Sequence, residues 1–148
     1  MAKDSVLEQI SESVVKAESE EKVKELTQRA VDEGYAVRQI IDDGLLVGLN
    51  RIGDMWNRGE AFIPEVILSA QAVAAGMEVI RDLIVESGIK PVGKVVIGTV
   101  KGDVHDIGKS LVAMMLRSAG FEVVDLGVDV APEKFVEAVK EHKPDLLG

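Results

Sequence analysis

The sequence predicts an α/β protein in which a helical bundle is followed by a parallel sheet. Apolar residues recur with helical spacing over residues 1–89, whereas β-branched runs alternate with helical segments over residues 90–148. Strands that alternate with helices of this length are joined by right-handed crossovers, which place the strands parallel to one another. We therefore expect two domains, a helical bundle over residues 1–89 and a doubly wound α/β domain over residues 90–148.

Amphipathic helices account for the first domain. Apolar residues stand three, four or seven positions apart, as in Leu7, Ile10 and Val14. The expected helices cover residues 7–14, 23–31, 37–41, 45–56 and 64–83. We expect a pause at residues 42–44, which read Asp-Asp-Gly, and an end at Gly88, because glycine commonly follows the last turn of a helix.

The second domain is predicted from three runs of strand length. Strands are expected at residues 94–100 and 121–126, and a third begins within residues 144–148. The first connecting helix ends at Gly120 and the second begins at Pro132. A doubly wound sheet usually has about five strands, so we expect this sheet to be truncated at its third strand. The alternative is a small sheet of two or three strands that leans on the bundle.

Composition excludes several kinds of site. The chain has no cysteine, which rules out disulfides, thiolate zinc sites, iron–sulfur clusters and a cysteine nucleophile. Its net charge of −9 argues against nucleic acid as a partner, because phosphate binding needs a basic surface. No apolar run approaches the roughly 20 residues of a membrane span, and the N-terminus is unlike a signal peptide. We expect an acidic cytoplasmic protein with no membrane partner.

The loop after the first expected strand is the candidate site. It contains Gly102, Asp103, Val104, His105, Asp106, Ile107 and Gly108. Ligands of open α/β sheets bind at the carboxyl ends of the strands, and a helix that begins near Gly108 directs free N–H groups there. A metal-bound imidazole usually donates its other N–H to a carboxylate, for which Asp103 is the candidate partner of His105. Gly102 and Gly108 permit tight turns close to a bulky ligand.

Other interpretations of this loop remain open from the residues alone. A lone histidine in a polar loop is often exposed to solvent or lies beside a helix cap. Asp103, His105 and Asp106 could hold a divalent cation, although three neighbours in one loop rarely complete a site. The glycines match neither the dinucleotide-binding fingerprint nor the phosphate-binding Walker loop, so a nucleotide site is weakly supported.

Residues 103–108 also match the D-x-H-x-x-G motif of cobalamin-binding domains, in which a protein histidine replaces the cofactor's own base on cobalt. Residues 43–53, 59–65 and 69–77 look like the helical cap of the same proteins. The chain thus resembles the corrinoid proteins of methanol and methylamine methyltransferase systems and the cobalamin module of methionine synthase. The resemblance covers nearly the whole chain.

This resemblance implies a helical cap over residues 1–89 and a flavodoxin-like (Rossmann-like) cobalamin-binding domain, incomplete here, over residues 90–148. The implied cofactor is cobalamin or a related corrinoid, bound by residues 102–108. It further implies that His105 is the lower axial ligand of cobalt and that Asp103 hydrogen-bonds to it.

The cap contains residues with two interpretations each. Phe62, with its neighbours Ile63 and Ile67, is either an apolar lid over the methyl-bearing face of the cofactor or ordinary bundle core. Gly48 and Gly53 either allow close helix packing or leave room for a flat ring, and close packing is the interpretation that we favour.

The implied function is that of a methyl carrier, a corrinoid subunit that is not a complete enzyme by itself. The implied partners are methyltransferase subunits on the donor and acceptor sides, together with a reductive activator. The alternatives are a cobalamin-dependent sensor and a flavodoxin-like receiver. The receiver needs acidic residues at the end of the first strand, where this chain has Thr99 and Val100.

Overall fold

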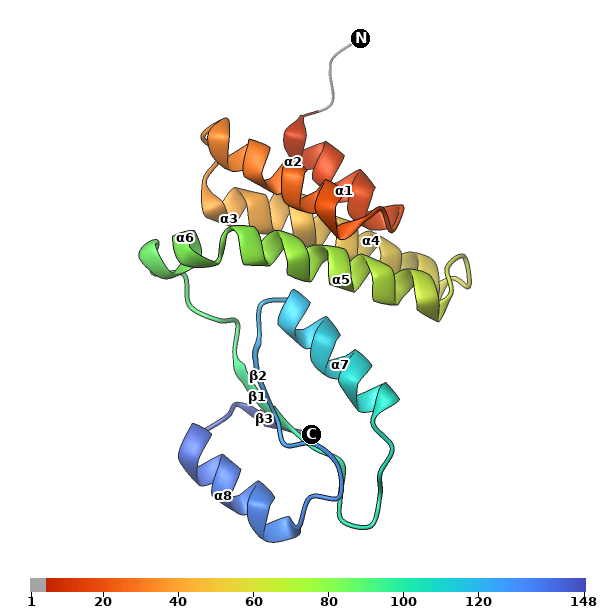
Figure 1. Cartoon of the computed structure of the whole chain (residues 1–148), viewed down its shortest axis with the longest axis vertical. Coiled ribbons are helices and arrows are strands. Elements are labelled where there is room, and N and C mark those ends of the chain that lie inside the picture. The colour runs from red at the N-terminus through yellow and green to blue at the C-terminus, as the bar shows by residue number, and fades with distance from the viewer. Residues whose placement is uncertain (1–4) are drawn as a thin grey trace. The chain divides into compact units, whose positions relative to one another are not determined.

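The computed structural model describes residues 5–148, and the backbone divides into two units, Met1–Ile89 and Lys90–Gly148 (Figure 1). The helical unit contains α1 (Val6–Val15), α2 (Glu20–Asp32), α3 (Val37–Gln39), a π-helix (Ile40–Leu45), α4 (Leu46–Asn57), α5 (Ile63–Val79) and α6 (Arg81–Glu86). The sheet unit contains β1 (Lys94–Ile97), α7 (Ile107–Ser118), β2 (Glu122–Asp125), α8 (Pro132–His142) and β3 (Leu146–Leu147). No helix in the described part of the chain is long and apolar enough to cross a membrane.

Local signals in the sequence set the starts of the first two helices. Ser5 and Glu8 form a reciprocal capping box at α1: the Ser5 hydroxyl accepts the Glu8 N–H at 3.2 Å, and the Ser5 N–H donates to Glu8 Oε2 at 2.8 Å. Ser19 caps α2 by accepting the Lys22 N–H. These caps orient the apolar faces of both helices into the core of the unit, where Ile10, Val14, Val23 and Leu26 are buried.

One buried hydroxyl in this core has no partner. Thr27 on α2 is fully buried, and its Oγ1 makes no hydrogen bond within residues 5–148. It faces the point where α2 approaches α5, since a Cβ at Gly76 would lie 3.1 Å from Thr27 Oγ1. A buried polar group without a partner loses its hydration and gains nothing in return.

We therefore expect Thr27→Val to raise the free energy of unfolding by about 1 kcal/mol, because valine keeps the branched shape and removes the unpaired hydroxyl. Chemical denaturation of both proteins measures the change. Thr27→Ser is the control, since it keeps the hydroxyl, removes the methyl group and should destabilise. A destabilised Thr27→Val variant would contradict the expectation.

The pause expected at residues 42–44 is absent. The chain remains helical from Val37 to Asn57 and passes through the π-helix Ile40–Leu45, whose wider turn takes up the Asp-Asp-Gly segment. This turn buries Ile40, Ile41, Gly44 and Leu45 and leaves the two aspartates outside. The prediction was wrong because it took two acids and a glycine as a break, whereas the burial of their apolar neighbours keeps the helix continuous.

The single long helix expected over residues 64–83 is also interrupted. α5 ends at Val79, and Ile80 leaves helical geometry with φ −101° and ψ 7° before α6 begins. The turn places the Ile80 side chain, which is fully buried, in the core. No glycine or proline marks the break, so tertiary packing, not local propensity, accounts for it.

In the sheet unit, three parallel strands lie in the order β2-β1-β3. β1 is central and its residues Val95, Val96 and Ile97 are buried, as expected for a strand covered on both faces. This order is that of the first three strands of a flavodoxin-like sheet. The predicted α/β class is confirmed, although β1 ends at Ile97, and Val100 forms only an isolated parallel bridge to Val130.

The two crossovers put their helices on opposite faces of the sheet, as Figure 1 shows for α7 and α8. The connection from β1 to β2 runs to one side of β1, and the connection from β2 to β3 returns across it. Two right-handed crossovers in opposite directions must cover opposite faces. The carboxyl end of β1 is consequently the switch point of the sheet, where ligands of such folds bind.

Candidate functional site

The loop that follows β1 is attached to the loop that follows β2. The Thr99 N–H donates to Gly127 O at 2.9 Å, and the Asp129 N–H donates to Asp103 O at 2.9 Å. In return, the Gly102 N–H donates to the Asp129 carboxylate at 2.8 Å. Gly102 has φ +84°, a conformation that favours glycine. The β1 loop is therefore fixed by its neighbour at several backbone positions.

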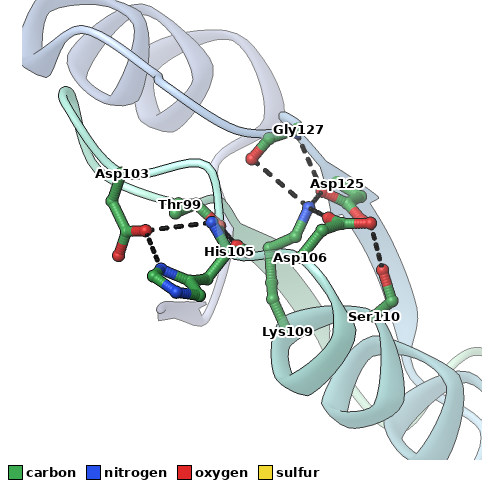
Figure 2. A network of polar contacts seen from close by, with 8 residues as sticks. All are labelled: Thr99, Asp103, His105, Asp106, Lys109, Ser110, Asp125 and Gly127. Carbon is green, nitrogen blue, oxygen red and sulfur yellow. Dashed lines mark hydrogen bonds and ion pairs between the residues drawn. The ribbon is translucent and has the colours of Figure 1, made fainter.

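His105 is held by both its main chain and its side chain (Figure 2). Asp103 Oδ1 accepts the His105 N–H at 2.9 Å and contacts His105 Nδ1 at 2.5 Å. The Thr99 hydroxyl donates to His105 O at 2.8 Å. The imidazole nevertheless stands in solvent, with 94% of the side chain exposed. This combination orients the ring without covering it.

Asp103 determines which ring nitrogen is free. The backbone N–H of His105, and then its ring, hold the pKa of Asp103 below its ordinary value, so the side chain is a carboxylate at neutral pH. A carboxylate can only accept, and a neutral imidazole beside it therefore carries its proton on Nδ1. The lone pair is then on Nε2, which has no partner among the residues that the structure describes. That nitrogen is available to a metal.

A second group of charged side chains lies directly after His105. Lys109 Nζ is 2.8 Å from Asp106 Oδ1 and 2.5 Å from Asp125 Oδ1, at the end of β2. Burial by itself raises the pKa of Asp125, but Lys109 and the Gly127 N–H outweigh it and lower the pKa. Hydrogen bonds from Lys109 and Ser110 lower the pKa of Asp106. The hydrogen bonds to Asp106 and then Asp125 raise the pKa of Lys109.

Two exposed aliphatic residues lie close to His105 in the sequence. Val104 is 72% exposed and Ile107 is 87% exposed, although both are aliphatic. A Cβ built on Gly108 meets no atom within 4 Å, so the start of α7 is open on that side. An open imidazole nitrogen on a segment with exposed aliphatic residues suits a flat, largely apolar ligand with a metal at its centre.

Residues 102–106 lie in the loop after β1, and Ile107 and Gly108 are the first two residues of α7. Phe62 belongs to the helical unit, where it precedes α5 and is 72% exposed. Ile63 is also exposed, so Phe62 and Ile63 are not core residues. Whether Phe62 covers the ligand stays a prediction.

The cation site considered from the sequence does not form. Within residues 5–148, no group of three or more histidines and acids is arranged to hold a metal ion. The reason is visible in Figure 2: Asp103 turns to His105, whereas Asp106 turns to Lys109 and Ser110. Any metal at His105 must therefore bring its other ligands with it.

An exposed histidine, oriented by a carboxylate, lies at the switch point of a parallel sheet that follows a helical unit, and this arrangement suits a protein that binds a metal-containing cofactor. Comparison with known proteins specifies the cofactor class. Sequence models of two domain families, both described as B12 binding domain, match residues 6–81 and residues 93–148. The chain belongs to the family of B12-binding corrinoid proteins. This confirms the resemblance found in the sequence and the expected corrinoid cofactor.

Individual relatives agree with this assignment. Dimethylamine corrinoid protein 1 of Methanosarcina acetivorans is 42% identical, over 100% of this chain and 69% of its own length. A corrinoid protein of Desulfitobacterium hafniense is 37% identical, over 97% of this chain and 68% of its own length. In the methanol:cobalamin methyltransferase complex MtaBC from Methanosarcina barkeri, a chain superposes with a TM-score of 0.85 at 38% identity. That match covers 99% of this chain and 56% of the other.

The residues present fit a corrinoid. The loop offers a single imidazole nitrogen, and a corrin would bring the other ligands of its metal with it, so no protein cage would be needed. The exposed Val104 and Ile107 could provide aliphatic surface for the macrocycle, and Gly102 and Gly108 carry no side chain that would obstruct it. The observations that carry this fit are the oriented, open Nε2 of His105 and the absence of other converging acids among the described residues.

Sequence reasoning assigned no role to two parts of this site. Lys109 and Asp125 are 16 positions apart, and only the pairing of β1 with β2 brings them together. Asp129 is likewise distant in sequence from Gly102. An acid at the end of a second parallel strand is a usable signal, because the carboxyl ends of adjacent parallel strands lie at the same edge of the sheet.

Proposed function

We propose that this chain binds a corrinoid through His105 and carries a methyl group between methyltransferase subunits. The observation that supports the proposal is the imidazole of His105, oriented by Asp103 through Nδ1 and open at Nε2. A bound corrinoid would supply a cobalt atom that accepts a methyl group from one protein and releases it to another.

Each residue of the loop has a separate part in this function. Asp103 fixes the tautomer of His105 and makes Nε2 a better donor to the metal. Val104 and Ile107 would cover the macrocycle and exclude water from its lower face. Gly102 and Gly108 leave space beside it. Phe62, an exposed aromatic side chain of the helical unit, would shield the upper face.

The proposed partners are methyltransferase subunits on the donor and acceptor sides and a reductive activator that returns the metal to its reactive state. The similarity to a chain of a methanol:cobalamin methyltransferase complex, and to corrinoid proteins named for dimethylamine, supports partners of this kind. In this proposal the chain is a carrier subunit, and activation of the methyl donor is the task of a partner.

Methyl transfer tests the proposal directly. The protein is mixed with methylcobalamin, separated from unbound cofactor by gel filtration and combined with acceptor-side methyltransferase and a thiol. We expect cofactor to elute with the protein and the labelled methyl group to move to the thiol only when the methyltransferase is present. Failure to retain cobalamin would overturn the proposal, and retention without transfer would limit the chain to binding.

A further inference from the structure

A partly buried lysine connects the histidine loop to the end of the neighbouring strand. The side chain of Lys109, in the first turn of α7, is only 9% exposed. Its ammonium contacts the carboxylates of Asp106 and Asp125 at 2.8 and 2.5 Å and donates to Gly127 O at 3.3 Å (Figure 2). Asp125 ends β2, and Asp106 is the residue after His105, so one cation links two parts of the fold.

The carboxylate of Asp106 is directed to the side chains of Lys109 and Ser110 and not to the backbone N–H groups of α7. Asp106 is the N-cap residue of α7, a position where an aspartate normally accepts an N–H of the first turn, yet it makes no such bond. Its Oδ1 pairs with Lys109, and its Oδ2 accepts the Ser110 hydroxyl at 3.0 Å. The side chain therefore acts as an anchor for the loop.

The anchor adds a restraint downstream of His105, whose own N–H and carbonyl are held by Asp103 and by the Thr99 hydroxyl. Upstream of His105, the loop after β2 holds Gly102 and Asp103 by hydrogen bonds. Downstream, the Asp106 carboxylate is the side chain that ties the loop to the end of β2, through Lys109. Without the ammonium, two carboxylates would face one partly buried position and repel each other.

We infer that Lys109 is a positioning residue for His105: by holding Asp106 against Asp125, it fixes the backbone from which the cobalt ligand projects. The inference rests on the proposed function. Lys109 acts through Asp106, because its ammonium contacts Asp106, Asp125 and the Gly127 carbonyl and not the imidazole. Lys109 would thereby raise the affinity of His105 for the metal, as the hydrogen-bond partners of metal ligands do.

Two variants and a control test the inference. Lys109→Met removes the ammonium at similar length, and Asp125→Asn removes one charged acceptor with little change in shape. Lys134→Met is the control, because Lys134 forms an exposed ion pair with Glu137 on α8. If circular dichroism shows that Lys109→Met does not fold, the result for Asp125→Asn alone tests the inference.

The first readout is amide hydrogen exchange in the cofactor-free protein. We expect the His105 N–H to exchange at least about tenfold faster in both test variants, as for the loss of a hydrogen bond to a charged group, and no change in the control. The second readout is the fraction of bound hydroxocobalamin with histidine coordinated, measured from its visible spectrum. This fraction should fall in both test variants, with affinity about tenfold weaker.

The outcomes separate the inference from the proposed function. Wild-type protein that retains no hydroxocobalamin would overturn the proposed function and, with it, the ligating role of the loop. Wild-type retention with unchanged exchange in both variants would overturn the inference alone. Faster exchange with an unchanged histidine-coordinated fraction would also overturn it, because Lys109 would then have a structural role only.

Discussion

Replacement of His105 by alanine is expected to abolish histidine coordination of a bound corrinoid. The substitution removes the one side chain of the loop that presents an open imidazole nitrogen. Outer partners of metal ligands typically contribute roughly 10–100-fold to affinity, so loss of the ligand itself should weaken cobalamin binding by at least about 100-fold. The visible spectrum shows the loss of coordination, and equilibrium dialysis against hydroxocobalamin measures the affinity.

The chain supplies its own control for this experiment. Its second histidine, His142, lies in the last turn of α8, far from His105 in sequence, and its Nε2 is 3.9 Å from the neighbouring Glu141 carboxylate. His142→Ala should therefore leave the spectrum unchanged. Free imidazole should restore coordination in His105→Ala, because the wild-type ring stands in solvent and its removal opens a path to the metal. Equal spectra for the two alanine variants would show that His105 is not the ligand.

The second large effect is expected in the helical unit, where Gly48→Ala should lower the free energy of unfolding by about 2 kcal/mol. A Cβ at this position would lie 2.7 Å from Val14 Cβ and 2.8 Å from the backbone oxygen of Ser11. Since backbone atoms of α1 cannot yield as a flexible side chain does, α1 and α4 must separate. Overpacking of this kind costs about 1–3 kcal/mol, more than alanine's helix propensity returns. Urea denaturation measures the change.

Gly53 provides the matched comparison on the same helix. A Cβ at Gly53 meets no atom within 4 Å, so Gly53→Ala should gain about 1 kcal/mol from helix propensity without a clash. The two substitutions make the same chemical change in α4, and their effects should differ in sign. A stabilised Gly48→Ala variant would show that the close contact between α1 and α4 is dispensable.

These two glycines also show which structural features could be predicted from the sequence and which could not. Close helix packing was the interpretation favoured for both, and the structure confirms it for Gly48 and contradicts it for Gly53, because only Gly48 lies where α4 packs against α1. Helical periodicity and the strand–helix alternation were enough to predict the elements themselves, because both depend on local spacing. The π-helix at residues 40–45 and the turn at Ile80 depend on burial in the core, which local spacing does not contain.

The candidate site likewise has a part that could be predicted from the sequence and a part that could not. Residues 102–108 were predictable, since a histidine two positions after an aspartate on a βα loop is a local pattern. The partners of that loop were not, because Asp125 and Asp129 reach it only through the order of the strands. The pairing of Lys109 with Asp125 is the contact that sequence reasoning had least means of finding.

One carboxylate oxygen in the loop makes two contacts with His105, and this determines how the imidazole can move. Asp103 Oδ1 holds the main chain of His105 and the ring of His105 at the same time. Rotation of the imidazole about its Cα–Cβ bond breaks the second contact and leaves the first, and the Thr99 hydroxyl still holds the carbonyl. The imidazole can therefore rotate while the backbone of His105 stays in place. Attachment and release of a ligand at this side chain require no refolding of the loop.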